Sequence, residues 1–156
     1  MDRKQLEQYI EIYSQLTQSI NNSMESIQKN TFKDSLVTPE QFNILNLVLT
    51  WETCTSSLLA KETGVKKSTI TAIITRLADK GLVNRIPDQN DRRTIHLQLT
   101  EKGQQVANEG RKKIFDRLMP LGNGLSSEDF KNLNANLAAI ADQMKSIKDG
   151  MEPNEH

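Results

Sequence analysis

The segment Thr55–Thr100 reads TSSLLAKETGVKKSTITAIITRLADKGLVNRIPDQNDRRTIHLQLT, and it decides the fold of this chain. Thr55 can cap a first helix, because its hydroxyl accepts a free backbone N–H, and Gly64 can end that helix in a left-handed conformation. A second helix over 68–80 carries apolar residues in the i, i+3, i+4, i+7 pattern of one buried face, and Gly81 ends it. Two helices around a short glycine-containing turn indicate a helix-turn-helix, whose second helix enters a DNA major groove.

The outward face of the second helix carries short hydroxyl and methyl side chains that suit the edges of bases. Ser and Thr donate or accept hydrogen bonds, Ala contacts the thymine methyl group, and Arg donates to guanine or phosphate. Composition alone fits an ordinary solvated helix face equally well. We predict that the major groove is read by Ser68, Thr69, Thr71, Ala72 and Thr75, and that phosphates are contacted by Lys66, Lys67, Arg76 and, from the following segment, Arg92.

Two lysines, Lys66 and Lys67, stand where this second helix should begin. Lysine is a poor N-cap, so the first-turn N–H groups are expected to lack a side-chain partner. A phosphate can take that place, attracted by the helix dipole and two ammonium groups, and water is the alternative. We predict a phosphate contact.

The segment after the second helix predicts a β-hairpin. Residues 82–86 have strand character, residues 87–91 are rich in turn formers, and residues 94–99 alternate polar with apolar side chains. Arg93 lies where the second strand leaves the tip, and an arginine on a thin protrusion can enter a narrow minor groove. Asp91 can hold a guanidinium by a bidentate pair. A charged, merely soluble turn is the alternative, and the preceding helix-turn-helix favours DNA contact.

These residues resemble the MarR family of winged-helix transcriptional regulators over about residues 38–103. The shared positions are Leu59-Ala60, Gly64, Ser68, Thr71, Arg76-Leu77, Gly81-Leu82-Val83, Asp91-Arg92-Arg93 and Leu97-x-Leu99-Thr100-x-x-Gly103. The resemblance implies a homodimer that binds a pseudo-palindromic operator in double-stranded DNA, usually as a repressor. It also implies that Arg93 reaches the minor groove and that Asp91 orients it.

The chain departs from the family pattern in its recognition helix. Lys66 and Lys67 stand where Ser and Pro are frequent, Ala72 where a larger basic residue is frequent, and Thr75 where an acidic one is frequent. The operator sequence therefore does not carry over. The resemblance also implies a small aromatic or phenolic effector between the dimer helices and the winged unit. Its candidate lining residues are Tyr9, Tyr13, Phe42 and Trp51, which are equally compatible with a place in the core.

Charges are unevenly distributed along the chain, although its formal net charge is zero. Residues 1–60 hold 4 Lys and Arg against 7 Asp and Glu, residues 61–93 hold 8 against 4, and residues 94–156 hold 8 against 9. The basic excess coincides with the predicted DNA-binding segment. We expect no signal peptide, no membrane span, no internal disulfide from the single cysteine, and a cytoplasmic protein.

Helical patterns flank the winged unit on both sides. One covers about residues 4–29, and Thr38, Thr100 and Ser126 are good starts for further helices. The first and last helices have apolar stripes without a core of their own, so we predict that they pair with each other and with a second copy. The alternative is that they fold back on their own winged unit.

The predicted fold is therefore mainly α with a small β-wing, a winged helix-turn-helix with N- and C-terminal dimerisation helices. Its predicted parts are an N-terminal helix and linker (1–36), the DNA-binding domain (37–99), C-terminal dimerisation helices (100–148) and a tail (149–156).

Other chemistries find little support in the sequence. It contains no phosphate-binding loop or dinucleotide-binding turn, and His96 and His156 complete no Ser/His/Asp set. We therefore predict no enzyme, no catalytic residue, no cofactor and no metal, since soft ligands are few. Two alternatives to an effector-controlled DNA-binding regulator remain: a redox-responsive regulator acting through Cys54, and a non-catalytic winged-helix module that docks a protein. Cys54 also fits a small buried hydrophobe.

Overall fold

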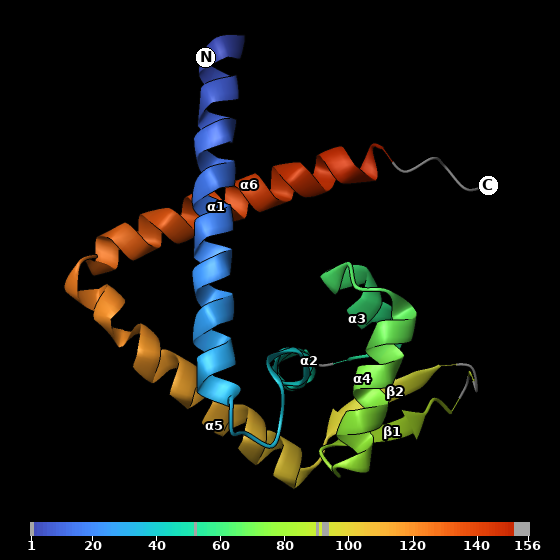
Figure 1. Cartoon of the computed structure of the whole chain (residues 1–156). Coiled ribbons are helices and arrows are strands. Elements are labelled where there is room, and N and C mark those ends of the chain that lie inside the picture. Colours follow the sequence, from blue (N-terminus) through green and yellow to red (C-terminus); the bar gives the residue numbers. More distant parts are fainter. Residues whose placement is uncertain (1, 52, 90, 92–93, 152–156) are drawn as a thin grey trace. The chain divides into compact units, whose positions relative to one another are not determined.

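The computed structural model of the chain describes residues 2–51, 53–89, 91 and 94–151, and these are mainly helical with one small sheet (Figure 1). Strands β1 and β2 pair antiparallel, with Val83 opposite Leu99 and Pro87 opposite Ile95. The elements are α1 (Arg3–Phe32), α2 (Pro39–Thr50), α3 (Ser56–Thr63), α4 (Lys67–Asp79), β1 (Val83–Pro87), β2 (Ile95–Leu99), α5 (Glu101–Leu118), the 3-10 helix η1 (Met119–Asn123) and α6 (Ser127–Asp149).

Local capping explains where α2 and α6 begin. The Thr38 hydroxyl accepts the Gln41 N–H at 3.3 Å, and the Gln41 side chain accepts the Thr38 N–H at 3.3 Å. Ser126 and Asp129 form the same reciprocal capping box, and these hydrogen bonds hold the pKa of Asp129 below its usual range. Both predicted starts are confirmed, whereas α1 is longer than the predicted 4–29.

The helix-turn-helix is formed by α3 and α4. The Thr55 hydroxyl accepts the Leu58 N–H at 3.1 Å, and Gly64 ends α3 with a φ of 69°, the left-handed conformation that glycine adopts without strain. Helix α4 begins one residue earlier than predicted, at Lys67. Its capping position, Lys66, makes no side-chain hydrogen bond to the helix, as the sequence predicted.

One hydrophobic core holds the winged unit together. Helix α4 contributes the predicted apolar stripe, with Ile70, Ile74 and Leu77 fully buried and Ile73 packed against them. The rings of Phe32 and Phe42 pack in a tilted arrangement with centroids 4.6 Å apart and join the end of α1 to α2. The other buried apolar residues are Val37, Ile44, Leu45, Val48, Cys54, Leu59, Leu82, Val83, Leu97, Leu99 and Ala107.

Two glycines allow α5 to approach this core closely. A Cβ on Gly103 would overlap the backbone carbonyl oxygen of Leu82, and a Cβ on Gly110 would lie 2.5 Å from the ring of Phe42. The Thr100 hydroxyl donates to the Gly81 carbonyl at 2.7 Å and accepts the Gly103 N–H at 2.9 Å. The start of α5 is thereby fixed to the end of α4.

The chain divides into two compact units, one ending at Arg117 and the other beginning at Leu118. The second unit contains η1 and α6, and α6 exposes apolar side chains along its length, among them Leu133, Leu137 and Met144. In α1, within the first unit, Ile10 and Leu16 are likewise exposed. The predicted division at residues 36, 99 and 148 stays a prediction. None of the helices in the described ranges is both long and apolar enough to cross a membrane.

Candidate nucleic-acid interface

Helix α4 presents the predicted contact residues on one exposed face, opposite the buried stripe. Three short side chains, at Ser68, Ala72 and Thr75, lie on it, so a neighbouring macromolecule can approach the helix backbone closely. Every predicted contact residue of α4 and its capping position is exposed: Lys66, Lys67, Ser68, Thr69, Thr71, Ala72, Thr75 and Arg76.

Two hydroxyls on this face already donate their protons to the helix backbone. The Thr71 hydroxyl donates to the Lys67 carbonyl at 2.8 Å, and the Thr75 hydroxyl donates to the Thr71 carbonyl at 2.9 Å. In this rotamer each oxygen offers only lone pairs to the outside. Such an oxygen can accept from the amino group of adenine or cytosine, but it cannot donate to guanine.

Arg85 is a residue of this surface that the sequence reasoning missed. Its guanidinium extends from β1 and donates to the Thr75 hydroxyl oxygen at 2.6 Å. Thr75 therefore has both its proton and an acceptor position engaged within the protein, and Arg85 adds a cation beside it. The available sequence signal was one basic residue in a predicted strand, which does not reveal the element that it contacts.

A groove of about 270 Å³ lies between the starts of α3 and α4 and the strand β2. It contains two predicted residues, Lys67 and Thr71, together with hydroxyl groups that the prediction omitted, from Ser56, Ser57 and Thr94. Hydroxyls and an ammonium around a groove suit the oxygens of a phosphate. The groove residues are Thr55, Ser56, Ser57, Lys67, Thr71, Thr94 and Ile95.

The wing is closed by hydrogen bonds within its turn. Asp88 Oδ1 accepts the Asp91 N–H at 2.9 Å, and Asp91 Oδ2 accepts the Thr94 hydroxyl at 2.9 Å. Asp88 Oδ2 lies 2.8 Å from His96 Nε2, so the imidazole ring of His96 connects the turn to strand β2. Arg92 and Arg93 lie outside the described residues, and their predicted contacts remain predictions.

The inner edge of β2 connects the wing to the helix-turn-helix. The Leu97 N–H donates to the Cys54 carbonyl at 2.8 Å, and Thr55 and His96 form a single antiparallel bridge. Ile95 shares the apolar alternation of Leu97 and Leu99, yet it is 42% exposed, because it pairs with Pro87 at the outer end of the hairpin, beyond the core.

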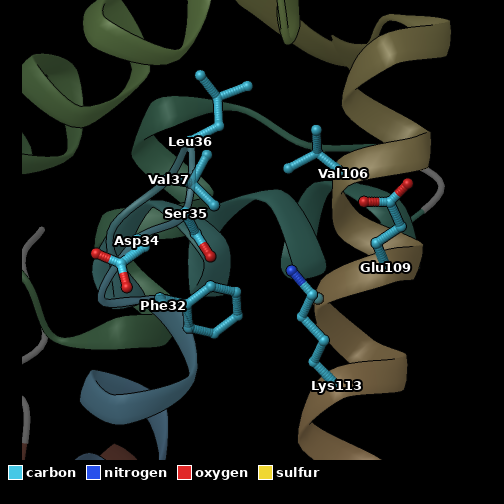
Figure 2. Close-up of a pocket in the computed structure, with 9 residues that line it drawn as sticks. Phe32, Asp34, Ser35, Leu36, Val37, Val106, Glu109 and Lys113 are labelled. Atoms are coloured by element: carbon cyan, nitrogen blue, oxygen red, sulfur yellow. The ribbon is translucent and has the colours of Figure 1, made fainter.

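The four aromatic residues predicted around an effector occupy different surroundings. Tyr9 is 62% exposed on α1 and Tyr13 is half-buried, whereas Phe42 is in the core and Trp51 packs against it. A different pocket of about 200 Å³ lies between the α1–α2 linker and α5 (Figure 2). It is lined by Phe32, Asp34, Ser35, Leu36, Val37, Val106, Glu109, Gly110 and Lys113.

Cys54 is buried, with 2% of its surface exposed. Burial raises the pKa of its thiol to about 11, because the thiolate would lose its hydration. A thiol that stays protonated reacts poorly with oxidants, so this environment disfavours redox sensing. Within the described ranges, no three His, Cys, Asp or Glu side chains gather as ligands for a metal.

A helix-turn-helix whose second helix is exposed, followed by a two-stranded wing, defines a winged helix. A family model described as the MarR family matches residues 37–95. The regulator FarR of Neisseria gonorrhoeae is 31% identical over 113 residues, covering 70% of this chain and 77% of FarR. The repressor MdtR of Bacillus subtilis is 31% identical over 135 residues, covering 81% of this chain and 82% of MdtR. The chain belongs to the MarR family, which confirms the resemblance.

Solved structures have the same fold. A cysteine-to-serine mutant of MarR from E. coli, complexed with operator DNA, matches with a TM-score of 0.69 at 22% identity, over 85% of this chain and 95% of that one. The predicted winged fold is thereby confirmed, and the protein is a transcriptional regulator with a helix-turn-helix rather than an enzyme.

Proposed function

We propose that this protein is a homodimeric, cytoplasmic repressor that binds a pseudo-palindromic operator and is released by a small molecule. The observation that carries the DNA-binding part is the exposed face of α4, with two lysines at its uncapped start and Arg85 at its side. Support comes from the E. coli relative, which was solved with operator DNA, and from MdtR, which is named a repressor.

The dimer is supported by apolar side chains that the single chain leaves exposed. Ile10, Leu16 and Ile20 are exposed on α1, and Leu137 and Met144 on α6. Burying these residues between two copies would stabilise the dimer by about 25 cal/mol for each Å² of apolar surface removed from water. A two-fold dimer would place two α4 helices in successive major grooves, about 34 Å apart.

Selection of DNA duplexes from a random library, followed by a salt titration of the winners, tests this function. We expect a palindrome with half-sites about ten base pairs apart. Weak, sequence-blind binding would contradict the proposal. It would favour the protein-docking alternative. That alternative is disfavoured because the exposed α4 residues named above include no large apolar anchor.

Within this proposal the residues keep their predicted roles. Arg93 enters the minor groove, held by Asp91, and Arg92 contacts phosphate. The major groove falls to Ser68, Thr69, Thr71 and Ala72, whereas Thr75 acts together with Arg85 because the two are hydrogen-bonded.

Replacing Lys67 with alanine should weaken operator binding and lower the salt slope by about one unit, because one phosphate contact and its released counterion are lost. The measurement is the slope of log affinity against log salt concentration. Lys61→Ala, at an exposed position of α3, is the matched control and should keep the slope. An unchanged slope for Lys67→Ala would remove Lys67 from the phosphate contacts.

Release by a ligand requires that the ligand bind more tightly to a dimer whose α4 helices do not fit DNA. The four predicted aromatic residues and the pocket of Figure 2 are two places to test. Crystals soaked with small aromatic acids would discriminate between them.

Cys54 supports no redox role in this proposal. We expect operator affinity to change less than twofold when the protein is treated with peroxide, and Cys54→Ala to behave in the same way, because the buried thiol stays protonated. Loss of binding by the wild type, but not by the alanine variant, would establish the redox alternative instead.

A further inference from the structure

Lys80, the residue directly after α4, reaches back to the segment that joins α1 to α2. Its ammonium donates to the Leu36 carbonyl at 2.7 Å and to Gln41 Oε1 at 2.8 Å. The partners lie 44 and 39 positions away in the sequence. The end of the DNA-facing helix is therefore attached to the linker through one side chain. Leu36 and Val37 of this linker are visible in Figure 2.

The acceptor Gln41 has little freedom to move. Its side chain is 4% exposed, and its Oε1 also accepts the Thr38 N–H that starts α2. A buried amide oxygen that lost the ammonium would be only partly satisfied, and hydrogen bonds from a charged donor are stronger than neutral ones. Breaking this contact would therefore cost free energy, and the contact joins two elements that are far apart in the sequence.

Other contacts hold the end of α4 from the side of α5. Lys102 donates its ammonium to the Lys80 carbonyl at 3.1 Å, and Thr100 donates to the Gly81 carbonyl at 2.7 Å. These contacts fix where the end of α4 lies. The Lys80 ammonium adds a second attachment, to the linker, and two attachments to different elements restrict the direction of the helix as well as its position.

We propose that Lys80 is a positioning residue that sets the direction of α4 against the α1–α2 linker, and thereby the half-site spacing that the dimer accepts. The 13 residues of α4 span about 20 Å at 1.5 Å per residue. A tilt of about 10° about its end would move its start by about 3.4 Å, the rise of one base pair. A fixed direction therefore distinguishes operators that differ by one base pair in spacing.

The inference rests on the proposed function, and its test uses the duplex that the wild-type protein selects. Versions with one base pair added or removed between the half-sites are compared by titration. We expect the wild type to bind the altered spacings at least about 30-fold more weakly, a loss of about 2 kcal/mol. Lys80→Met keeps a long side chain without the hydrogen-bond donors. It should bind the selected duplex more weakly than the wild type does, and its affinities for the selected and altered spacings should differ by less than about threefold.

Two further variants separate positioning from a general loss of charge or stability. Lys80→Arg retains donors and should retain most of the discrimination. Lys102→Met removes a neighbouring ammonium that does not reach the linker, while the Thr100 hydroxyl still attaches the end of α4 to α5, so this variant should keep the wild-type preference for the selected spacing. Equal discrimination by wild type and a folded Lys80→Met protein would overturn the inference, whereas a wild type that selects no sequence would overturn the proposed function instead.

If circular dichroism shows that Lys80→Met is unfolded at the assay temperature, Gln41→Glu decides the question. Glutamate suits this position of a capping box, so α2 keeps its start, and a carboxylate opposite the Lys80 ammonium strengthens the attachment. The ratio of the affinity for the selected duplex to that for the altered spacings is expected to rise at least about twofold. An unchanged ratio would overturn the inference.

Discussion

Replacing Gly103 with alanine is expected to lower the free energy of unfolding by about 1–3 kcal/mol, the range typical of overpacking. Alanine normally stabilises a helix by up to about 1 kcal/mol relative to glycine, so helix propensity alone gives the opposite sign. Here the new Cβ would overlap the Leu82 carbonyl oxygen. Backbone cannot rotate away as a side chain can, and Leu82 is itself fully buried, so α5 must move.

Urea unfolding at one fixed protein concentration measures this effect, since a dimer's apparent stability depends on concentration. Gln105→Ala, an exposed substitution two residues further along α5, serves as the control and should change the free energy by less than about 0.5 kcal/mol. A Gly103→Ala protein as stable as the wild type, or more stable, would contradict the close approach of α5.

Helix boundaries were predictable because the signals that set them are local. The Thr38 and Gln41 pair lies within four residues, and Gly64 acts through its own φ of 69°. The start of α4 was misplaced by one residue because Lys66 provides no side-chain cap, so the sequence contains no marker for it. The capped starts of α2 and α6 were predicted correctly, whereas the start of α4, which has no side-chain cap, was misplaced.

The arrangement of long polar side chains could not be predicted. The Arg85–Thr75 hydrogen bond joins residues ten apart, and the Lys80–Leu36 bond joins residues 44 apart. Each depends on how the elements pack, and arginine and lysine have many rotamers. The sequence accordingly assigned Thr75 to the bases alone and gave Lys80 no role beyond the end of a helix.

Periodicity predicted which side of an element faces the core more reliably than it predicted how deeply each residue is buried. The apolar stripe of α4 is buried as predicted, since the whole helix lies across the core. On β2 the alternation places Leu97 and Leu99 inside, but Ile95 follows the same pattern and is exposed. A strand can extend past the core that it helps to form, and its alternation contains no information about where the core ends.

Replacing Ala72 with glutamate should weaken operator binding by more than about 100-fold, or about 2.7 kcal/mol. Ala72 is exposed on the face of α4 between Thr71 and Thr75, where the backbone is to approach the bases. A longer, negative side chain there would hold α4 away from the groove and bring a carboxylate close to phosphates. The fold should be unaffected, because Ala72 lies opposite Ile70 and Ile74 of the buried stripe.

Fluorescence titration of the selected duplex measures the loss, and thermal unfolding checks the fold. Asn108→Glu, which adds the same charge at an exposed position of α5, is the matched control and should lower affinity by no more than about threefold. An equal loss in both variants would assign the effect to net charge rather than to contact. Full binding by Ala72→Glu would show that α4 does not enter the groove by this face, and the wing and the groove beside Lys67 would then be the next surfaces to test.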